Sequence, residues 1–349
     1  MTEELMSILP LVLREKEALT ETDIQKIKEQ YCKCGRDQFE AFLRTEKSNV
    51  PFASLLLSEI DCDADYWRTI HNTYVNRSCQ IIDFLKPLFT DYYQNGGRTL
   101  CVVENFASML SSGISVGCFA SNDVDMTADI EEKEYLKNIF SKNGFVMDHR
   151  GNHPMDNKQI TTFYNKDVMN GQGYWLNVMW TPVSRTYLLP QSKTSKRLQK
   201  ERVFNSECYQ DTDIRILRPT ALVYFCAIHQ ACEHYYSASP GMTLQCDIDR
   251  VVRTRTVDWD SILSWSKEDD YGCRITMSLD VCNYCLGTPV PLDKFDRASK
   301  IYKKLRKNIL SDKSGQINPQ LGKVNRLYVE LASDNKPIIW ALISRMWRK

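Results

Sequence analysis

Two acidic residues alternate with apolar residues in the order Asp123-Val124-Asp125-Met126, and this pattern constrains the fold more than any other feature of the chain. Successive side chains of a β-strand point to opposite faces. Asp123 and Asp125 are therefore predicted to share one face, while Val124 and Met126 bury the other. A connection containing glycine and serine precedes this segment, and a helical pattern follows it. The alternation predicts a strand that is buried on one side and flanked by helices.

Two carboxylates on one strand face have the chemistry of a magnesium site. Mg²⁺ prefers oxygen ligands and usually completes its coordination shell with water and substrate phosphates. The same spacing also occurs on strands whose polar face is simply hydrated, so the spacing alone does not establish a metal site. The metal ligands that we assign from the sequence are Asp123 and Asp125.

The composition limits the partners of the chain. It has 349 residues, of which 43% are hydrophobic and 26% are charged, which is typical of a globular protein with one large or two ordinary domains. Lys and Arg number 45 against 44 Asp and Glu, giving a net charge of +1. No overall field therefore attracts nucleic acid or an anionic membrane, and we expect neither as a partner.

The N-terminal segment and the cysteines indicate the compartment. Acidic residues stand where a secretory signal has basic ones, and the apolar run is interrupted by Pro10 and closed by Arg14. No apolar run approaches the length of a membrane span. Thirteen cysteines without a secretion signal are typical of reduced thiols rather than a disulfide framework. We therefore expect a cytoplasmic protein.

Hydrophobic periodicity divides the chain into three regions. Residues 1–95 are predicted to form an N-terminal helical region, residues 96–190 a core of strands and helices, and residues 203–349 a mainly helical C-terminal domain. The basic segment 192–200 between the last two is predicted to be a solvated linker. The expected fold class is α+β, with a small mixed sheet covered by helices.

The expected elements alternate in type within the core and are helical after it. In the first two regions they are a helix at 66–93, a strand at 100–103, a short helix at 106–110, the acidic strand, a helix at 130–143, and strands at 160–164 and 175–180. In the C-terminal region they are helices at 221–236, 247–253, 259–268, 274–286 and 294–310, and two docking elements within 327–347. Four residues between two of the core strands, Asp148, His149, His153 and Asp156, have the types of metal ligands, but their spacing favours a polar hairpin loop.

Several short segments, in order and spacing over about residues 75–291, resemble a known superfamily. They are Val102 to Phe106, Asp123-Val124-Asp125, Asn143-Gly144-Phe145, Leu176 to Trp180, Leu222 to His234, Leu244 to Ile248, Val257-Asp258-Trp259 and Leu286 to Pro291. This order is similar to that of the nucleotidyltransferases that share the polymerase-β palm, and in particular to a bacterial group described only as nucleotidyltransferase family proteins. The resemblance implies a small mixed sheet of palm type with N-terminal helices and a C-terminal helical domain.

The same resemblance implies a reaction. A nucleoside monophosphate would pass from a nucleoside triphosphate to a hydroxyl of a small molecule, sugar or peptide. Asp123 and Asp125 would bind Mg²⁺ against the phosphates, and Asn177 stands where the superfamily has a third catalytic carboxylate.

The resemblance also suggests residues around the acid pair. Gly113, Gly117 and Ser121 are predicted to bind the nucleotide, because small residues allow backbone N–H groups to approach phosphates, although they are also ordinary turn residues. His229 and Asp247 are predicted to line the cleft between the core and the helical domain. By their spacing alone, His229 has the position of a core residue and Asp247 that of a residue at the start of a helix.

The chain departs from the superfamily pattern at several positions. The usual Lys-Gly pair, an arginine before the first aspartate, the third carboxylate and a histidine are replaced by Glu104-Asn105, Phe119, Asn177 and Met179. Asparagine offers a neutral oxygen but cannot act as a base or neutralise Mg²⁺. Two interpretations besides nucleotidyl transfer therefore stay open. One is a catalytically altered or inactive nucleotidyltransferase fold that binds nucleotide or peptide, and the other is a helical interaction protein in which the two acids lie on the surface.

Overall fold

The computed structural model describes most of the chain up to residue 310. The described residues are 2–45, 49–150, 153–154, 156, 160–180, 197, 200–201, 205–232, 234, 236, 242–269 and 271–310. The two elements expected within 327–347 and most of the basic segment 192–200 lie outside the described residues. Within the described part of the chain, no helix is both long enough and apolar enough to cross a bilayer.

A mixed sheet forms the centre of the core, and the acidic strand lies inside it. In spatial order, its seven strands within the described residues are β3-β6-β7-β2-β1-β9-β8. Strand β2 runs parallel to β7 and antiparallel to β1, and β6 runs antiparallel to β7. The strands are β1 (Cys101–Val102), β2 (Asp123–Thr127), β3 (Val146–Met147), β6 (Ile160–Asn165), β7 (Tyr174–Met179), β8 (Glu207–Cys208) and β9 (Arg215–Ile216). A separate hairpin pairs β4 (His149–Arg150) with β5 (His153–Pro154).

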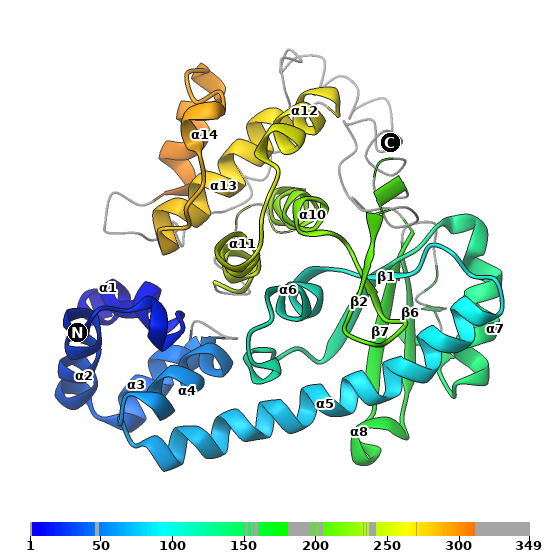
Figure 1. Cartoon of the computed structure of the whole chain (residues 1–349), viewed down its shortest axis with the longest axis horizontal. Coiled ribbons are helices and arrows are strands. Elements are labelled where there is room, and N and C mark those ends of the chain that lie inside the picture. The colour runs from blue at the N-terminus through cyan, green and yellow to red at the C-terminus, as the bar shows by residue number, and fades with distance from the viewer. Residues whose placement is uncertain are drawn as a thin grey trace.

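Helices surround this sheet and extend away from it on one side (Figure 1). The N-terminal helices are α1 (Thr2–Val12), α2 (Glu21–Cys34), α3 (Arg36–Thr45) and α4 (Asn49–Glu59), followed by the long α5 (Ala64–Gln94). The core contains α6 (Glu104–Ser112), α7 (Lys133–Lys142) and α8 (Val168–Gly171). The C-terminal helices are α10 (Pro219–Cys232), α11 (Thr243–Thr254), α12 (Trp259–Glu268), α13 (Gly272–Leu286) and α14 (Lys300–Ile309). This arrangement confirms the predicted α+β class.

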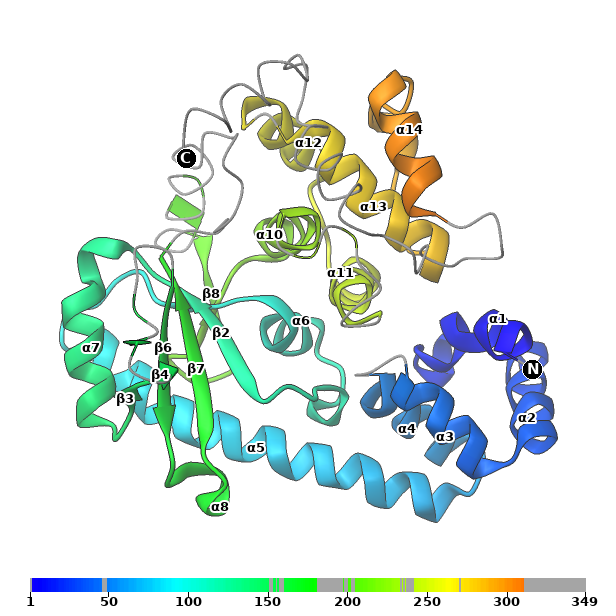
Figure 2. The same ribbon diagram turned by 180° about the vertical axis from the view of Figure 1, so that it is seen from behind.

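The alternation predicted for β2 is confirmed. Val124 and Met126 are fully buried, whereas the two aspartates are partly exposed. The buried face of the sheet packs against α5, where the ring of Phe84 lies 5.6 Å from the ring of Tyr174 in β7. Helix α6 covers part of the opposite, acid-bearing face, and Figure 2 shows α6 and α7 on opposite sides of the sheet. The two acids therefore point towards the side on which the helical domain lies.

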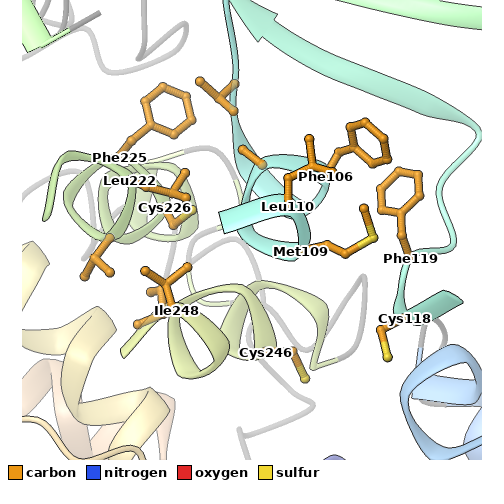
Figure 3. Packing of buried hydrophobic residues seen from close by; sticks show 14 of the residues in the cluster. Phe106, Met109, Leu110, Cys118, Phe119, Leu222, Phe225, Cys226, Cys246 and Ile248 are labelled. Atoms are coloured by element: carbon orange, nitrogen blue, oxygen red, sulfur yellow. The ribbon is translucent and has the colours of Figure 1, made fainter. Parts of the chain in front are cut away.

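Helix α6 is fixed over the sheet by its packing against α10 and α11. Figure 3 shows apolar side chains of the three helices directed towards one another, and their burial is the main force that holds the helical domain against the core. The labelled residues include Phe106, Met109, Leu110, Leu222, Phe225 and Ile248. The first turn of α6 is thereby held next to β2.

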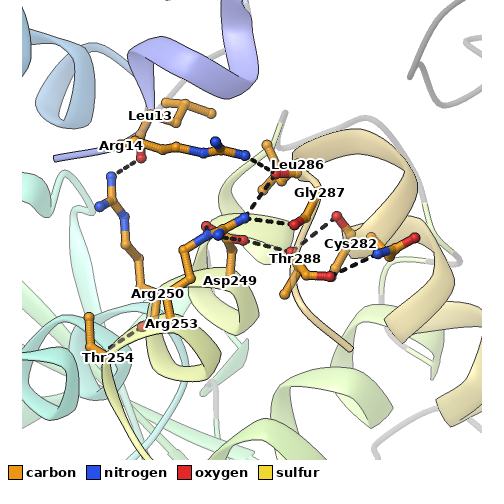
Figure 4. Close-up of polar contacts among 11 residues, drawn as sticks. Leu13, Arg14, Asp249, Arg250, Arg253, Thr254, Cys282, Leu286, Gly287 and Thr288 are labelled. Carbon is orange, nitrogen blue, oxygen red and sulfur yellow. Dashed lines mark hydrogen bonds and ion pairs between the residues drawn. The ribbon is translucent and has the colours of Figure 1, made fainter. Parts of the chain in front are cut away.

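Polar contacts of α11 join the helical domain to the N-terminal helices (Figure 4). Arg250 donates to the backbone carbonyl of Leu13. Arg14 donates to the carbonyl of Leu286 at 2.9 Å, and Arg253 donates to the same carbonyl at 3.1 Å. We call this group of contacts, which also includes Asp249 and Thr288, the α11 clamp. It joins Leu13 to Arg250, which lie 237 positions apart in the sequence.

Several predicted boundaries are wrong. Helix α10 ends at Cys232 rather than at 236, and α14 begins at Lys300 rather than at 294. Helix α11 begins at Thr243, so Asp247 does not start a helix but lies buried in its second turn. The apolar spacing of α11 extends back to Leu244, which explains the earlier start. Strands β8 and β9 were not predicted, because two-residue strands carry no periodic signal.

Candidate active site

Asp123, Asp125 and Asn177 lie together on the acid-bearing face of the sheet. Asp125 and Asn177 are directly opposite one another in the β2–β7 register. The side-chain amide of Asn177 donates to Oδ2 of Asp123 at 2.8 Å and to Oδ1 of Asp125 at 3.0 Å. Its own Oδ1 accepts a hydrogen bond from Thr162 at 2.8 Å. Asn177 therefore bridges the two carboxylates as a hydrogen-bond donor, and its oxygen is turned away from them.

The turn before β2 holds Asp123 in place. Ser121 donates from Oγ to Oδ1 of Asp123 at 2.5 Å. Arg77 of α5 donates to the backbone carbonyl of Ser121 at 3.2 Å and to Oδ1 of Asn122 at 2.8 Å. The structure therefore brings Ser121 to the acid pair, while its part in nucleotide binding stays a prediction.

Gly113 and Gly117 lie further along the connection. Gly113 ends α6 with a φ of +71°, a left-handed conformation that favours glycine. Gly117 packs against α5, where an added Cβ would lie 2.5 Å from the ring of His71. This packing is a sufficient reason for glycine at 117. The assignment of these two glycines to the nucleotide stays a prediction.

Glu104 is an additional acid of the site, which the sequence marked only as a departure from the superfamily's lysine. It is buried at the start of α6 with a φ of +58°, a conformation that residues other than glycine rarely adopt. Such backbone strain is most often found at functional sites. Burial and the neighbouring carboxylates of Asp125, Asp247 and Asp123 raise the pKa of Glu104 well above its usual range.

The two aspartates nearest to Glu104 are shifted in the same direction. Burial and the charge of Asp123 raise the pKa of Asp125 to about 7. Burial and the charge of Asp125 raise the pKa of Asp247 well above its usual range. We call Glu104, Asp123, Asp125 and Asp247 the acid cluster. It concentrates more negative charge than a buried site accommodates without a counter-ion.

His229 lies at the edge of the acid cluster. Its Nδ1 is 3.1 Å from Oε1 of Glu104, although the two atoms are not aligned as a hydrogen bond. Its Nε2 is 2.9 Å from Nε2 of His234. Burial and His234 lower the pKa of His229 well below its usual range, so the ring is neutral at pH 7. His229 is thus a buried residue, as its spacing indicated, and it adjoins Glu104 of the acid cluster. Its place in a cleft between the core and the helical domain stays a prediction.

The acid pair fits a hard divalent cation such as Mg²⁺. The raised pKa of Asp125 reports the burial of its charge and repulsion from Asp123, and a bound cation would offset both. Among the described residues, no group of three or more histidine, cysteine or acidic side chains is arranged to hold a metal ion. The chain would therefore supply Asp123 and Asp125 and leave the other positions to water and phosphate oxygens, as is usual for Mg²⁺.

A cavity of about 280 Å³ opens beside Asp123, on the side of β7 and β6. Its lining residues are Asn122, Asp123, Asp148, Thr162, Trp175 and Asn177. Four of them, Asp123, Thr162, Trp175 and Asn177, belong to the face of the sheet that carries the acid pair. Asp125 does not line the cavity, so the cavity adjoins one side of the pair only.

The polar residues near β4 and β5 form a hairpin, as predicted, but they do not stay together. Asp156 forms ion pairs with Lys133 and, at 2.8 Å, with Lys137 of α7. Asp148 instead lines the cavity next to Asp123. No local pattern predicted this role, because the placement of Asp148 in the same cavity as Asp123 depends on the pairing of strands far apart in the chain.

Comparison with known proteins agrees with this geometry. Residues 120–287 match the model of a family described as an uncharacterised nucleotidyltransferase. The matched segment contains Asp123, Asp125, Asn177, His229 and Asp247, and it begins after Glu104. No curated protein and no solved structure matches the chain.

Proposed function

Residues 120–287 match the model of this nucleotidyltransferase family. On this basis we propose that the chain transfers a nucleoside monophosphate from a nucleoside triphosphate to a hydroxyl group with the help of Mg²⁺. The family supports nucleotide transfer in general, and the metal and the hydroxyl acceptor are part of the proposal. One observation carries it: Asp123 and Asp125 share a strand face and are bridged by the amide of Asn177.

Each residue of the site has a definite task in this proposal. Asp123 and Asp125 hold the divalent ion, which when bound neutralises phosphate charge and orients the triphosphate. Asn177 keeps the two carboxylates at a fixed separation by donating to both. Ser121 and Arg77 fix the turn that carries Asp123. Since phosphoryl transfer requires mainly positioning and charge stabilisation, this rigid support contributes directly to the rate.

The test is the double variant Asp123→Ala with Asp125→Ala, examined by calorimetry with Mg²⁺ and ATP. We expect Mg²⁺-dependent ATP binding to weaken at least about 100-fold, because both carboxylate ligands are lost. The matched control is Asp211→Ala, which removes an exposed acid from the turn between β8 and β9. Circular dichroism checks that both variants remain folded. Unchanged ATP binding in the folded double variant would refute the assigned site.

A second function is favoured by one observation, the buried carboxylate of Glu104 beside Asp125. An acid in place of the superfamily's lysine cannot neutralise phosphate charge, and Asn177 cannot act as a base. The second candidate is a nucleotide- or peptide-binding module that does not catalyse transfer. Measurement of pyrophosphate release, at ATP and Mg²⁺ concentrations where calorimetry shows binding, distinguishes the two. Release that depends on a hydroxyl acceptor supports transfer, whereas binding without release supports the module.

A further inference from the structure

The exposed side chain of Trp175 lines the cavity beside the acid pair. Trp175 is the cross-strand partner of Asp123, and 37% of its surface is exposed. Its ring lies 4.7 Å from the ring of Tyr164, at an interplanar angle of 37°. Tyr164 packs over Gly173, where any Cβ would collide with the tyrosine hydroxyl. Trp175 is therefore supported by a second ring that is itself fixed, and it offers the cavity a flat apolar surface.

The polar lining of the cavity restricts the charge of its ligand. Asp148 adds a second carboxylate to that of Asp123, and Asn122, Thr162 and Asn177 are neutral. Among the residues that the structure describes, the lining includes no lysine, arginine or histidine. With Asp123 engaged by the divalent ion, the carboxylate of Asp148 still repels phosphate, which disfavours this cavity as the place of the triphosphate chain.

The in-line geometry of nucleotidyl transfer indicates which reactant the cavity would hold. In an in-line reaction at the α-phosphorus, the attacking hydroxyl and the leaving pyrophosphate lie on opposite sides. The acidic lining of the cavity disfavours the leaving pyrophosphate, and the cavity still reaches Asp123. It is therefore on the side from which an acceptor hydroxyl approaches.

We propose that this cavity binds the acceptor, and that the acceptor is a sugar without phosphate or carboxylate groups whose ring stacks on Trp175. This inference rests on the proposed function. The apolar C–H face of the ring contacts the indole, and the carboxylate of Asp148 accepts hydrogen bonds from ring hydroxyls. Asn122, whose Oδ1 accepts from Arg77, has its amide N–H groups to donate to the same ring. A cavity of about 280 Å³ has room for a ligand of this size.

The experiment uses saturation-transfer NMR on the full chain with Mg²⁺ and a non-hydrolysable ATP analogue. The probes are D-glucose, D-glucosamine and glucose 6-phosphate, and the variants are Trp175→Ala, Trp175→Phe and Asp148→Asn. Asp211→Asn is the matched control for the loss of an acid. We expect the first two sugars to bind the wild-type protein and glucose 6-phosphate to bind at least about tenfold more weakly, because its charge faces Asp148.

The variants separate stacking from charge selection. Trp175→Ala should weaken glucose binding about tenfold and Trp175→Phe much less, since phenylalanine keeps an aromatic surface. Asp148→Asn should remove most of the discrimination against glucose 6-phosphate, and Asp211→Asn should not. If the ATP analogue binds but neither uncharged glucose nor glucosamine does, the inference is overturned while the proposed function stands.

Two other outcomes would also overturn the inference. Trp175→Ala that weakens the ATP analogue instead of the sugars would identify the tryptophan as a surface for the nucleobase. Unchanged discrimination in Asp148→Asn would show that this carboxylate does not face the ligand. Failure of the wild-type protein to bind the ATP analogue with Mg²⁺ is a different result, because it refutes the proposed function itself.

Discussion

Asp247 and Asp249 lie two residues apart on α11, and both are buried, yet their surroundings are opposite. Asp249 accepts two hydrogen bonds from Nε of Arg253, at 2.9 and 3.0 Å, and one from Thr288 at 2.7 Å. Asp247 faces Asp125 and has no cationic partner among the described residues. Successive residues of a helix are rotated by about 100°, so the two side chains leave α11 on opposite sides.

This difference separates a structural charge from a functional one. In the α11 clamp, the buried carboxylate of Asp249 is paired with Arg253 of the same helix and also accepts a hydrogen bond from Thr288, which lies beyond α13 (Figure 4). Among the described residues the acid cluster has no cationic partner, and burial together with neighbouring carboxylates raises the pKa of Glu104, Asp125 and Asp247. Buried charge that the fold does not compensate is typical of sites that bind a ligand of opposite charge.

The largest effect that the comparison predicts is the loss of the clamp carboxylate. Asp249→Ala should lower the free energy of unfolding by about 3 kcal/mol, because Arg253 and Thr288 lose their buried partner. Urea denaturation followed by circular dichroism measures this change. The control is Asp260→Ala, which removes an exposed ion pair with Lys294 and should cost less than about 1 kcal/mol. Equal effects of the two substitutions would contradict the description of the clamp.

An intermediate effect is predicted for pH. The pKa of Asp125 is about 7 in the folded protein and about 4 in an unfolded chain, so the folded state binds the extra proton between these values. Without metal, the free energy of unfolding should therefore fall as pH rises from about 4 to 7, by a total on the order of a few kcal/mol. Asp125→Asn should reduce this slope. Denaturation at pH 5 and pH 8, with and without the substitution, is the measurement.

The same titration should govern metal binding. Mg²⁺ competes with the proton on Asp125, so its affinity should increase about tenfold between pH 6 and pH 8 and change little above pH 8. Calorimetry at these pH values tests the effect. An affinity that does not depend on pH would place the metal away from Asp125.

The smallest effect is predicted for Asp247→Asn. At pH 8 this substitution removes repulsion from the acid cluster and should stabilise the metal-free protein by about 1 kcal/mol. The gain should be smaller at pH 5 than at pH 8, because burial and the charge of Asp125 raise the pKa of Asp247 and lower pH favours its neutral form. The two denaturation experiments together distinguish Asp247 from Asp249. Destabilisation at both pH values would mean that Asp247 is paired like its neighbour.

Local patterns predicted much of the fold. The helix expected at 66–93 corresponds to Ala64–Gln94, and the acidic strand and the helix at 259–268 were also placed correctly. These elements have a regular alternation of apolar and polar residues, which depends only on the period of the backbone. The strands β8 and β9 were missed because very short strands carry little of that signal, and the start of α11 was placed too late although its apolar spacing reaches back to Leu244.

The sequence by itself determined that Asp123 and Asp125 share a face, because side chains two residues apart on a strand always do. It also indicated the nucleotidyltransferase family, through the order of its motifs. Only the tertiary structure decided that Glu104 and Asp247 join this pair, that Asn177 bridges it, and that Asp148 and Trp175 line the cavity beside it. These contacts join strands and helices distant in the chain, and their geometry follows from sheet pairing and helix packing, which no local pattern encodes.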